Sequence, residues 1–228
     1  MTSHPAPSDR PETPAASPAD DRLFDPAAAL SLIHEQQRSV IRQQLSGVPW
    51  ILGVWGLAWG VGFLVLWSGY DGGNPWFRLP LGVAGTIFGA LLVVAIAVSA
   101  VVGSRIGRGI EGASAFSGAV YGASWMLGSG SVFAVGVALA RAGVDGLLLS
   151  LYYPAAYALV AGLIYLMGAA LWRSLDQLVL GAIILIVGSI APFFGAPTNN
   201  LVMALLGGGA FLVAAVVMQV GLRRGSRA

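Results

Sequence analysis

The chain has 228 residues, of which 57% are hydrophobic and only 10% are charged, and its mean hydropathy is +0.79. Soluble domains carry about 25% charged residues, so this composition excludes an ordinary soluble domain and predicts a polytopic membrane protein. The formal charge of +2 is too small for a nucleic-acid partner, and a chain without cysteine holds no disulfide, thiolate metal site or cysteine nucleophile.

The first 22 residues are rich in Pro, Ala, Ser and Asp and lack apolar periodicity, which predicts a disordered cytoplasmic leader. Residues 23–47 are expected to form an amphipathic helix, because Asp25 can act as N-cap and Pro26 suits the first helical position. The apolar side chains on one side of this helix are Ala27, Leu30, Ile33, Val40, Ile41 and Leu45. The stripe fits a helix lying on the membrane surface, and over residues 26–46 it also fits a contact helix for a cytosolic protein.

Six apolar runs follow, and each is long enough for about 20 helical residues. They lie at 49–70, 80–102, 115–140, 147–172, 178–196 and 201–222, and none has an ionisable residue in its central part. The predicted fold class is therefore an all-α polytopic membrane helix bundle. Residues 48–222 form its six-helix transmembrane domain in the lipid bilayer, and residues 223–228 form a basic cytoplasmic tail.

All 12 basic residues are arginines, and they divide unevenly between the two ends of the predicted spans. Ten lie on the side of the leader and the tail, whereas only Arg78 and Arg141 lie on the other side. This bias predicts a multi-pass protein of the cell membrane with both termini in the cytoplasm. Aromatic residues support these boundaries, since Trp67, Tyr70, Trp76, Phe77, Tyr152 and Tyr153 would form the outer belt and Trp50 and Trp172 the inner one.

A short motif occurs twice at matching depth. The stretch Val54-Trp55-Gly56-Leu57-Ala58-Trp59 returns 66 residues later as Val120-Tyr121-Gly122-Ala123-Ser124-Trp125, and a glycine follows each copy at Gly62 and Gly128. Because both copies lie in spans that run in the same direction, the pattern favours a parallel duplication of a two-helix hairpin.

Small residues and prolines indicate how the spans pack. The pairs Gly56/Gly60, Gly85/Gly89 and Gly118/Gly122, and the seven-residue series Gly181, Gly188 and Gly195, would let helix backbones approach closely. We expect these contacts mainly within one chain, and they also allow a homo-oligomer. Pro154 and Pro192 should kink their spans and leave backbone carbonyls in need of other partners.

The search for catalytic groups finds little. His34-Glu35-Gln36-Gln37-Arg38 begins like a zinc-protease helix but lacks the second histidine, and no histidine, aspartate or lysine lies in the spans to activate Ser129 or Ser131. We therefore expect a non-enzymatic protein without metal or cofactor. The most distinctive side chains in the spans are Trp55, Trp59, Tyr121 and Trp125, which could line an aromatic ligand cleft between the first and third spans or simply fill a helix interface.

The helix sequence Ala27-Ala28-Ala29-Leu30-Ser31-Leu32-Ile33-His34-Glu35-Gln36-Gln37-Arg38, followed by Trp55-Gly56-Leu57-Ala58-Trp59, resembles small six-span membrane proteins of actinobacteria. Some of these are labelled transporters or permeases. A helix before six spans is also similar to the permease subunits of ABC exporters, although the large loops expected there are missing. The resemblance implies a six-span fold and carries over no catalytic or binding residue.

Two functions fit the sequence. The first is a transport-related, non-enzymatic protein that handles a neutral or lipophilic small molecule. The second is a membrane anchor or sensor whose helix docks a cytosolic regulator or an ATPase partner. Spans without internal charge count against a proton-driven pump, because intramembrane charges usually mark ion pathways.

Overall fold

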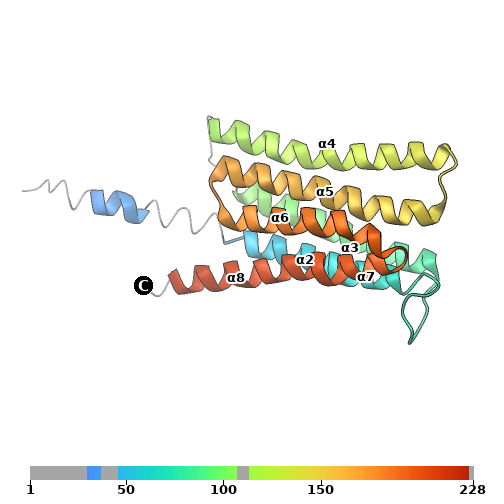
Figure 1. Ribbon diagram of the computed structural model, residues 1–228. Coiled ribbons are helices and arrows are strands. Elements are labelled where there is room, and N and C mark those ends of the chain that lie inside the picture. Colours follow the sequence, from blue (N-terminus) through green and yellow to red (C-terminus); the bar gives the residue numbers. More distant parts are fainter. Residues whose placement is uncertain (1–29, 37–45, 107–112, 226–228) are drawn as a thin grey trace, which may run out of the picture. The chain divides into compact units, whose positions relative to one another are not determined.

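The computed structural model describes residues 30–36, 46–106 and 113–225 (Figure 1). The chain separates into two compact units, Met1–Arg42 and Gln43–Ala228. In the first unit, residues 30–36 form a helix within the predicted amphipathic segment, and its Leu30, Leu32 and Ile33 side chains are exposed. The predicted leader, the rest of that segment up to residue 45 and the last three residues lie outside the described part of the chain.

The second unit consists of helices joined by turns, and its described residues contain no strand. Four spans are the single helices α2 (Val48–Trp67), α3 (Leu81–Ile106), α4 (Ala113–Arg141) and α5 (Gly146–Trp172). The fifth is α6 (Leu175–Ile190) with the 3-10 turn η2 (Ala191–Phe194), and the sixth comprises α7 (Thr198–Val202), the π-helical turn η3 (Met203–Gly208) and α8 (Gly209–Gly225). All six are long and apolar enough to cross a membrane, which confirms the predicted all-α six-span bundle.

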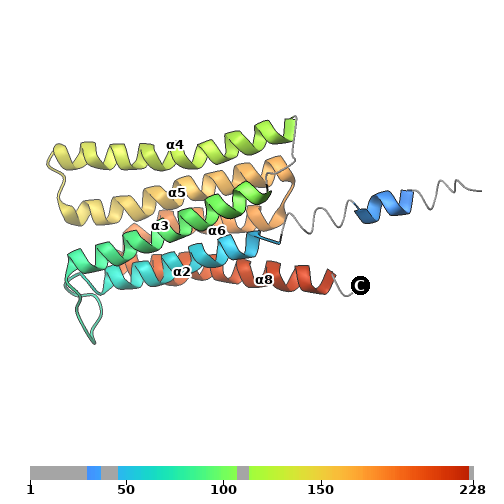
Figure 2. The same ribbon diagram turned by 180° about the vertical axis from the view of Figure 1, so that it is seen from behind.

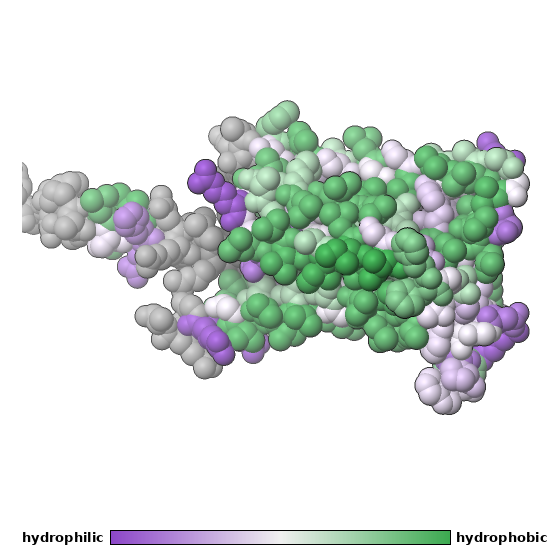
Figure 3. All heavy atoms as spheres, viewed as in Figure 1, coloured by the Kyte–Doolittle hydropathy of each residue, from purple (hydrophilic) through white to green (hydrophobic). Residues whose placement is uncertain are grey.

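The turns that reverse the chain follow from local sequence. The Asp145 carboxylate accepts a hydrogen bond from the Leu148 N–H at the start of α5, and Ser174 caps α6 in the same way through Gln177. Arg173 adopts a left-handed backbone conformation at the end of α5, with φ of 50°. These short connections make consecutive helices antiparallel. Since all six helices are apolar and the surface between their ends is widely apolar (Figure 3), the molecule is an integral membrane protein.

The antiparallel order separates the arginines of the described spans as the sequence predicts. Arg105, Arg173, Arg223 and Arg224 belong to one end of the bundle, and Arg78 and Arg141 to the other. The cytoplasmic position of the first end stays a prediction, since it depends on the positive-inside rule.

The helices pack around a core built mainly by α2, α5, α6 and the α7–α8 segment. Its fully buried side chains include Ile184, Met203 and the two asparagines Asn199 and Asn200. By contrast, α3 packs chiefly on α2, and α4 packs chiefly on α5. Both outer helices therefore turn most of their side chains outward, α4 at one edge of the bundle and α3 obliquely across the face seen in Figure 2.

The predicted glycine motifs fall into two groups. In the core, a Cβ at Gly56 would lie 2.7 Å from Leu212 Cγ, one at Gly181 3.0 Å from the Gly162 carbonyl oxygen, and one at Gly188 2.6 Å from Ala158 Cβ. Gly60 lies against the backbone of η3. Here small residues bring helices together within one chain.

The second group has no such contact. Apart from the nearby backbone of its own helix, no heavy atom lies within 4 Å of a Cβ added at any of the paired glycines of the two outer helices, Gly85, Gly89, Gly118 and Gly122. Gly195 differs again, because it ends η2 with φ of 69° and also faces open space. It is a turn residue, so it does not continue the packing face of Gly181 and Gly188.

Candidate functional site: a buried amide pair beside an aromatic row

The turn between the fifth and sixth spans contains two prolines and a glycine. Pro192 lies in η2, Gly195 turns the chain, and Pro197 precedes the five-residue helix α7. Proline lacks a backbone N–H and fixes φ, so two prolines around a glycine with positive φ cannot continue an α-helix. The result is a short, irregular turn at the end that carries Arg78 and Arg141, with Phe193 and Phe194 exposed and the following Asn199 and Asn200 buried.

Two amide side chains are buried in this segment. Asn199 and Asn200 are each only 1% exposed. The Asn199 Nδ2 group donates a hydrogen bond of 2.9 Å to the backbone carbonyl of Ser150, and the Asn200 Nδ2 group lies 3.4 Å from Asn199 Oδ1. Buried amides in an apolar bundle are costly unless they have partners, so these bonds fix α7 against α5.

The partner of Asn199 has a specific origin. In an α-helix the carbonyl of residue 150 accepts a hydrogen bond from the N–H of residue 154. Pro154 has no N–H, so the Ser150 carbonyl would lack an intrahelical donor. Asn199, from the sixth span, supplies the missing donor. The start of the sixth span therefore supplies the hydrogen-bond donor that Pro154 removes from α5.

The π-helical turn η3 lies directly against the aromatic motif of α2. A Cβ at Gly207 would lie 2.9 Å from Trp59 Cε3, and the next residue, Gly208, packs on the backbone of Gly60. Trp59 itself is 6% exposed. The small residues of η3 thus make room for the Trp59 ring, and π-helical turns frequently occur at functional sites.

Trp59 belongs to a row of rings that crosses the bundle. The row begins at Phe88 on α3, runs through Phe63 and Trp59 on α2, and reaches Phe211 on α8, with centroid distances of 4.9, 5.6 and 5.3 Å. It continues from Phe211 to Tyr165, Trp125, Tyr121 and Trp172, at 5.9, 5.4, 6.2 and 4.8 Å. Five of these seven ring contacts are edge-to-face, an arrangement that stabilises packing beyond the buried area.

The four aromatic residues predicted from the sequence are distributed along and beside this row. Tyr121 and Trp125 have their rings in contact, whereas Trp59 and Trp125 are connected only through Phe211 and Tyr165. Trp55 lies outside the row and donates a hydrogen bond of 2.9 Å from Nε1 to Ser99 Oγ on α3. The structure therefore joins three of the four residues in one row, with rings of α5 and α8 between the first and third spans.

One acceptor at the far end of the row is unused. Among the described residues, Gln177 Oε1 is the buried side-chain oxygen or nitrogen without a hydrogen-bond partner. It lies against Gly168, where the Tyr121 ring also packs. A ligand N–H or O–H group would satisfy this oxygen.

The chemistry available in the spans is neutral. Apart from Ser68, the buried polar residues of the described chain are Asn199 and Asn200. Within residues 30–36, 46–106 and 113–225, no group of three or more histidines, cysteines or carboxylates could hold a metal ion. The site can hydrogen-bond uncharged groups through amides and carbonyls and can pack apolar groups against rings.

Sequence reasoning did not single out Asn199 and Asn200. The available signal was their position, because two consecutive asparagines stand at the start of an apolar run and follow Pro192, Gly195 and Pro197. The kink at Pro154 indicated a carbonyl in need of a donor but did not identify that donor. Only the folded bundle, in which α5 and the sixth span start at the same end, brings Asn199 to Ser150.

Comparison with known proteins adds no relative: no family model matches the chain, and neither curated proteins nor solved structures give a significant match. The resemblance to small actinobacterial six-span proteins therefore stays a prediction.

Proposed function

We propose that this integral membrane protein is non-enzymatic and transport-related, and that it handles a neutral or lipophilic small molecule. The observation that carries the proposal is the pair of buried amides, Asn199 and Asn200, at the start of the sixth span, directly before the π-helical turn η3. Transporters commonly place their binding sites where helices are irregular and freed backbone groups meet the substrate, and here the Ser150 carbonyl is such a group.

The neutral character of the ligand follows from the groups around it. Asn199 and Asn200 are uncharged, and the central parts of the spans carry no ionisable residue to act as counter-ion. A ligand hydroxyl or amide can exchange with Asn199 at the Ser150 carbonyl, since that carbonyl has no donor of its own within α5. The buried ring of Trp59, which packs against Gly207 of η3 and against Phe211, supplies apolar packing in the same part of the sixth span.

Flux through purified protein in proteoliposomes tests this proposal. The probes are glycerol as a neutral polar solute, Nile red as a neutral lipophile and tetraethylammonium as a charged control. We expect one neutral probe, but not the cation, to cross faster than in protein-free vesicles. The Asn199→Ala/Asn200→Ala variant should slow that flux by at least about fivefold, because each lost hydrogen bond contributes about 1 kcal/mol.

Trp50→Ala is the matched control, because Trp50 is 69% exposed and lies at the opposite end of the bundle from α7. It should leave the flux unchanged. Wild-type protein that moves neither neutral probe, or a folded double variant with full flux, would count against the proposal.

One observation favours the second function, an anchor or sensor that docks a cytosolic protein. The helix at residues 30–36 leaves Leu30, Leu32 and Ile33 between 51% and 59% exposed. In this case Leu30→Asp/Ile33→Asp should lose a defined partner that co-purifies with the wild-type protein. Leu32→Asp, which lies on another side of the helix, should retain it. Equal loss from both variants would argue against recognition by this stripe.

A further inference from the structure

The loop between α2 and α3, residues 68–80, is held in a defined shape by its own polar groups. The Asn74 amide donates to Ser68 Oγ at 3.0 Å, and Asn74 Oδ1 accepts from the Trp76 N–H at 3.0 Å. The Leu79 N–H donates to the Ser68 carbonyl at 3.0 Å, which brings the two legs of the loop together. Ser68, at the centre of these bonds, is only 4% exposed.

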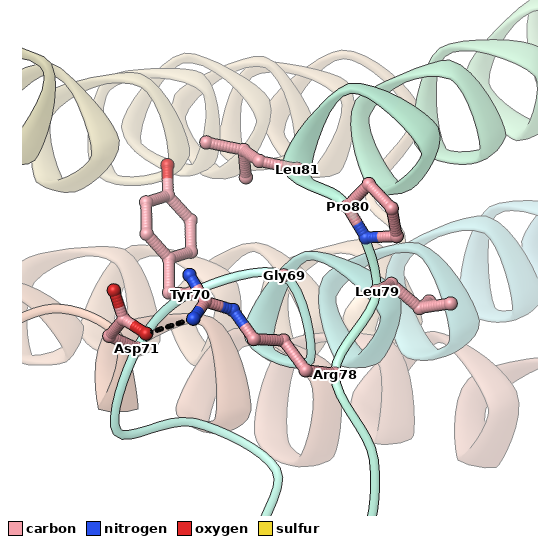
Figure 4. A pocket seen from close by; sticks show the side chains of 7 residues that line it. All are labelled: Gly69, Tyr70, Asp71, Arg78, Leu79, Pro80 and Leu81. Atoms are coloured by element: carbon pink, nitrogen blue, oxygen red, sulfur yellow. Dashed lines mark ion pairs between the residues drawn. The ribbon is translucent and has the colours of Figure 1, made fainter.

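Between the two legs lies an open pocket of about 480 Å³ (Figure 4). Tyr70 and Asp71 line it from the outgoing leg, and Arg78 and Leu81 from the returning leg and the start of α3. Figure 4 shows Arg78 reaching across the loop toward Asp71, while Tyr70 and Leu81 extend above the ion pair in this view. Charges of both signs, an aromatic ring and an apolar edge thus share one pocket.

A charged ligand can replace either partner of the Asp71–Arg78 ion pair. Its side chains are 84% and 63% exposed, and solvent-exposed pairs of this kind stabilise a fold only weakly. A guanidinium has five N–H donors, and the contact with Asp71 is made through one nitrogen, Nη1. A ligand carrying both charges can therefore place its anionic group on Arg78 and its ammonium group on Asp71, with the Tyr70 ring beside the cation.

Exposed aromatic residues indicate where this pocket lies in the membrane. Trp76 and Phe77, in the same loop, are 82% and 57% exposed. Tryptophan and tyrosine side chains concentrate at the level of the lipid headgroups, because one part of the ring system is apolar and the other is polar. A pocket at this depth faces the phosphate and amine groups of phospholipids.

An apolar stripe leads away from the pocket along α3. Leu81 lines the pocket, and Gly85 and Gly89 follow it at intervals of one helical turn, with no heavy atom within 4 Å of an ideal Cβ at either glycine. Val93 and Ile96 continue the stripe and are 66% and 58% exposed. This exposed apolar stripe begins at the pocket, where the acyl chains of a bound headgroup would start.

We propose that the Tyr70–Asp71–Arg78 pocket binds the headgroup of a zwitterionic phospholipid, phosphatidylethanolamine, and that the stripe from Leu81 to Ile96 receives one of its acyl chains. Arg78 binds the phosphate, Asp71 binds the ammonium group, and Gly85 and Gly89 leave room for the chain. This site is separate from the proposed transport site at Asn199, so the two proposals can fail independently.

Native mass spectrometry of the purified full-length protein tests the site. The probes are dioleoyl phosphatidylethanolamine, dioleoyl phosphatidylglycerol and the chain-free headgroup glycerophosphoethanolamine. We expect the wild type to bind phosphatidylethanolamine about tenfold more tightly than phosphatidylglycerol, since the ammonium group adds a charge-assisted contact with Asp71. Asp71→Asn should remove this preference, and Arg78→Gln should weaken the binding of both lipids.

The remaining variants separate the lipid from a soluble zwitterion. Gly85→Leu/Gly89→Leu fills the stripe and should weaken the lipid but leave glycerophosphoethanolamine unchanged. Arg141→Gln changes an exposed arginine in the last turn of α4, at the same end of the bundle, and should leave binding unchanged. The proposal is overturned if Asp71→Asn keeps the lipid preference or if Arg141→Gln weakens binding as much as Arg78→Gln. It is also overturned if the chain-free headgroup binds as tightly as the lipid.

Discussion

The two copies of the aromatic–glycine motif have nearly the same sequence pattern and very different surroundings. In α2, Gly56 lies against Leu212 of α8, and Trp59 is 6% exposed between Phe63 and Phe211. In α4, no heavy atom lies within 4 Å of a Cβ at the equivalent Gly122, and Trp125 is only partly buried. The first copy is in the core of the bundle, and the second is in a helix at its edge.

Equivalent residues of the two copies have similar contacts where they face the next helix of their own hairpin. A Cβ at Gly62 would meet Phe88 of α3, and one at Gly128 would meet Val160 of α5. Trp55 likewise contacts Ser99 of α3, and Tyr121 contacts Trp172 of α5. The motif therefore specifies packing within a hairpin, whereas burial of its other face depends on a third element, which α8 provides for α2. This agreement sharpens the duplication hypothesis, which stays a prediction.

The largest difference between the copies should appear when the first glycine is enlarged. Gly56→Leu places a side chain where Leu212 Cγ and the Leu212 backbone N already lie, at 2.7 and 2.9 Å from the Cβ position. We expect a loss of about 3 kcal/mol or failure to fold, because overpacking displaces backbone. Gly122→Leu meets open space and should keep the wild-type thermal midpoint in detergent. Equal loss in both variants would contradict the difference in surroundings.

Truncating the second aromatic residue should also separate the copies, although here both variants lose stability. Trp59→Ala removes a buried ring that contacts Phe63, Phe211 and Gly207, and should cost about 3–5 kcal/mol. Trp125→Ala should cost less than half as much, because part of this ring is exposed to the surroundings. Unfolding in SDS, followed by circular dichroism, measures both losses. A larger loss for Trp125→Ala would contradict the position of Trp59 in the core and of Trp125 at the edge of the bundle.

Much of this architecture can be predicted because it depends on local properties. Apolar length defines the six spans, and Asp145 and Ser174 mark helix starts by side-chain capping. Gly56 and Gly122 show where prediction stops, since one motif predicts close packing for both and only one has a neighbour. Which face of a span meets another helix depends on the arrangement of all six, and a single span does not encode it.

The candidate site was partly predictable for the same reason. Trp59 and Trp125 are visible in the sequence as rare residues at matching depth, but Phe211 and Tyr165, which connect them, look like ordinary span residues. Asn199 gains its meaning only beside Ser150, 49 residues away in sequence. A contact between distant spans depends on how all the spans pack, so neither the aromatic row nor the contact of Asn199 with Ser150 can be predicted from one span alone.

The proline of the second hairpin gives a third contrast. The first hairpin has no proline inside α2 or α3 beyond the first turn, whereas Pro154 frees the Ser150 carbonyl in α5. Asn199→Ala should cost about 1–3 kcal/mol, since a buried carbonyl loses its donor. Pro154→Ala restores an N–H at residue 154, so the same asparagine change should cost less in that background. A double-mutant cycle in SDS unfolding measures this coupling, and additive losses would show that Asn199 does not replace the proline's missing donor.

The smallest effect should come from a side-chain hydrogen bond that joins the two helices of each hairpin. Trp55 Nε1 donates to Ser99 Oγ in the first hairpin at 2.9 Å, and Tyr152 Oη donates to the Val132 carbonyl in the second at 3.0 Å. Hydrogen bonds between membrane helices contribute about 0.6 kcal/mol on average, so Tyr152→Phe should cost roughly that amount. Trp55→Phe also shrinks the ring, and comparing its cost with and without Ser99→Ala isolates the hydrogen bond. Similar values for the two bonds would indicate that the hairpins are equivalent units whose differences arise from α8. A first bond several times stronger than the second would mean that the core position of α2 strengthens the hairpin itself.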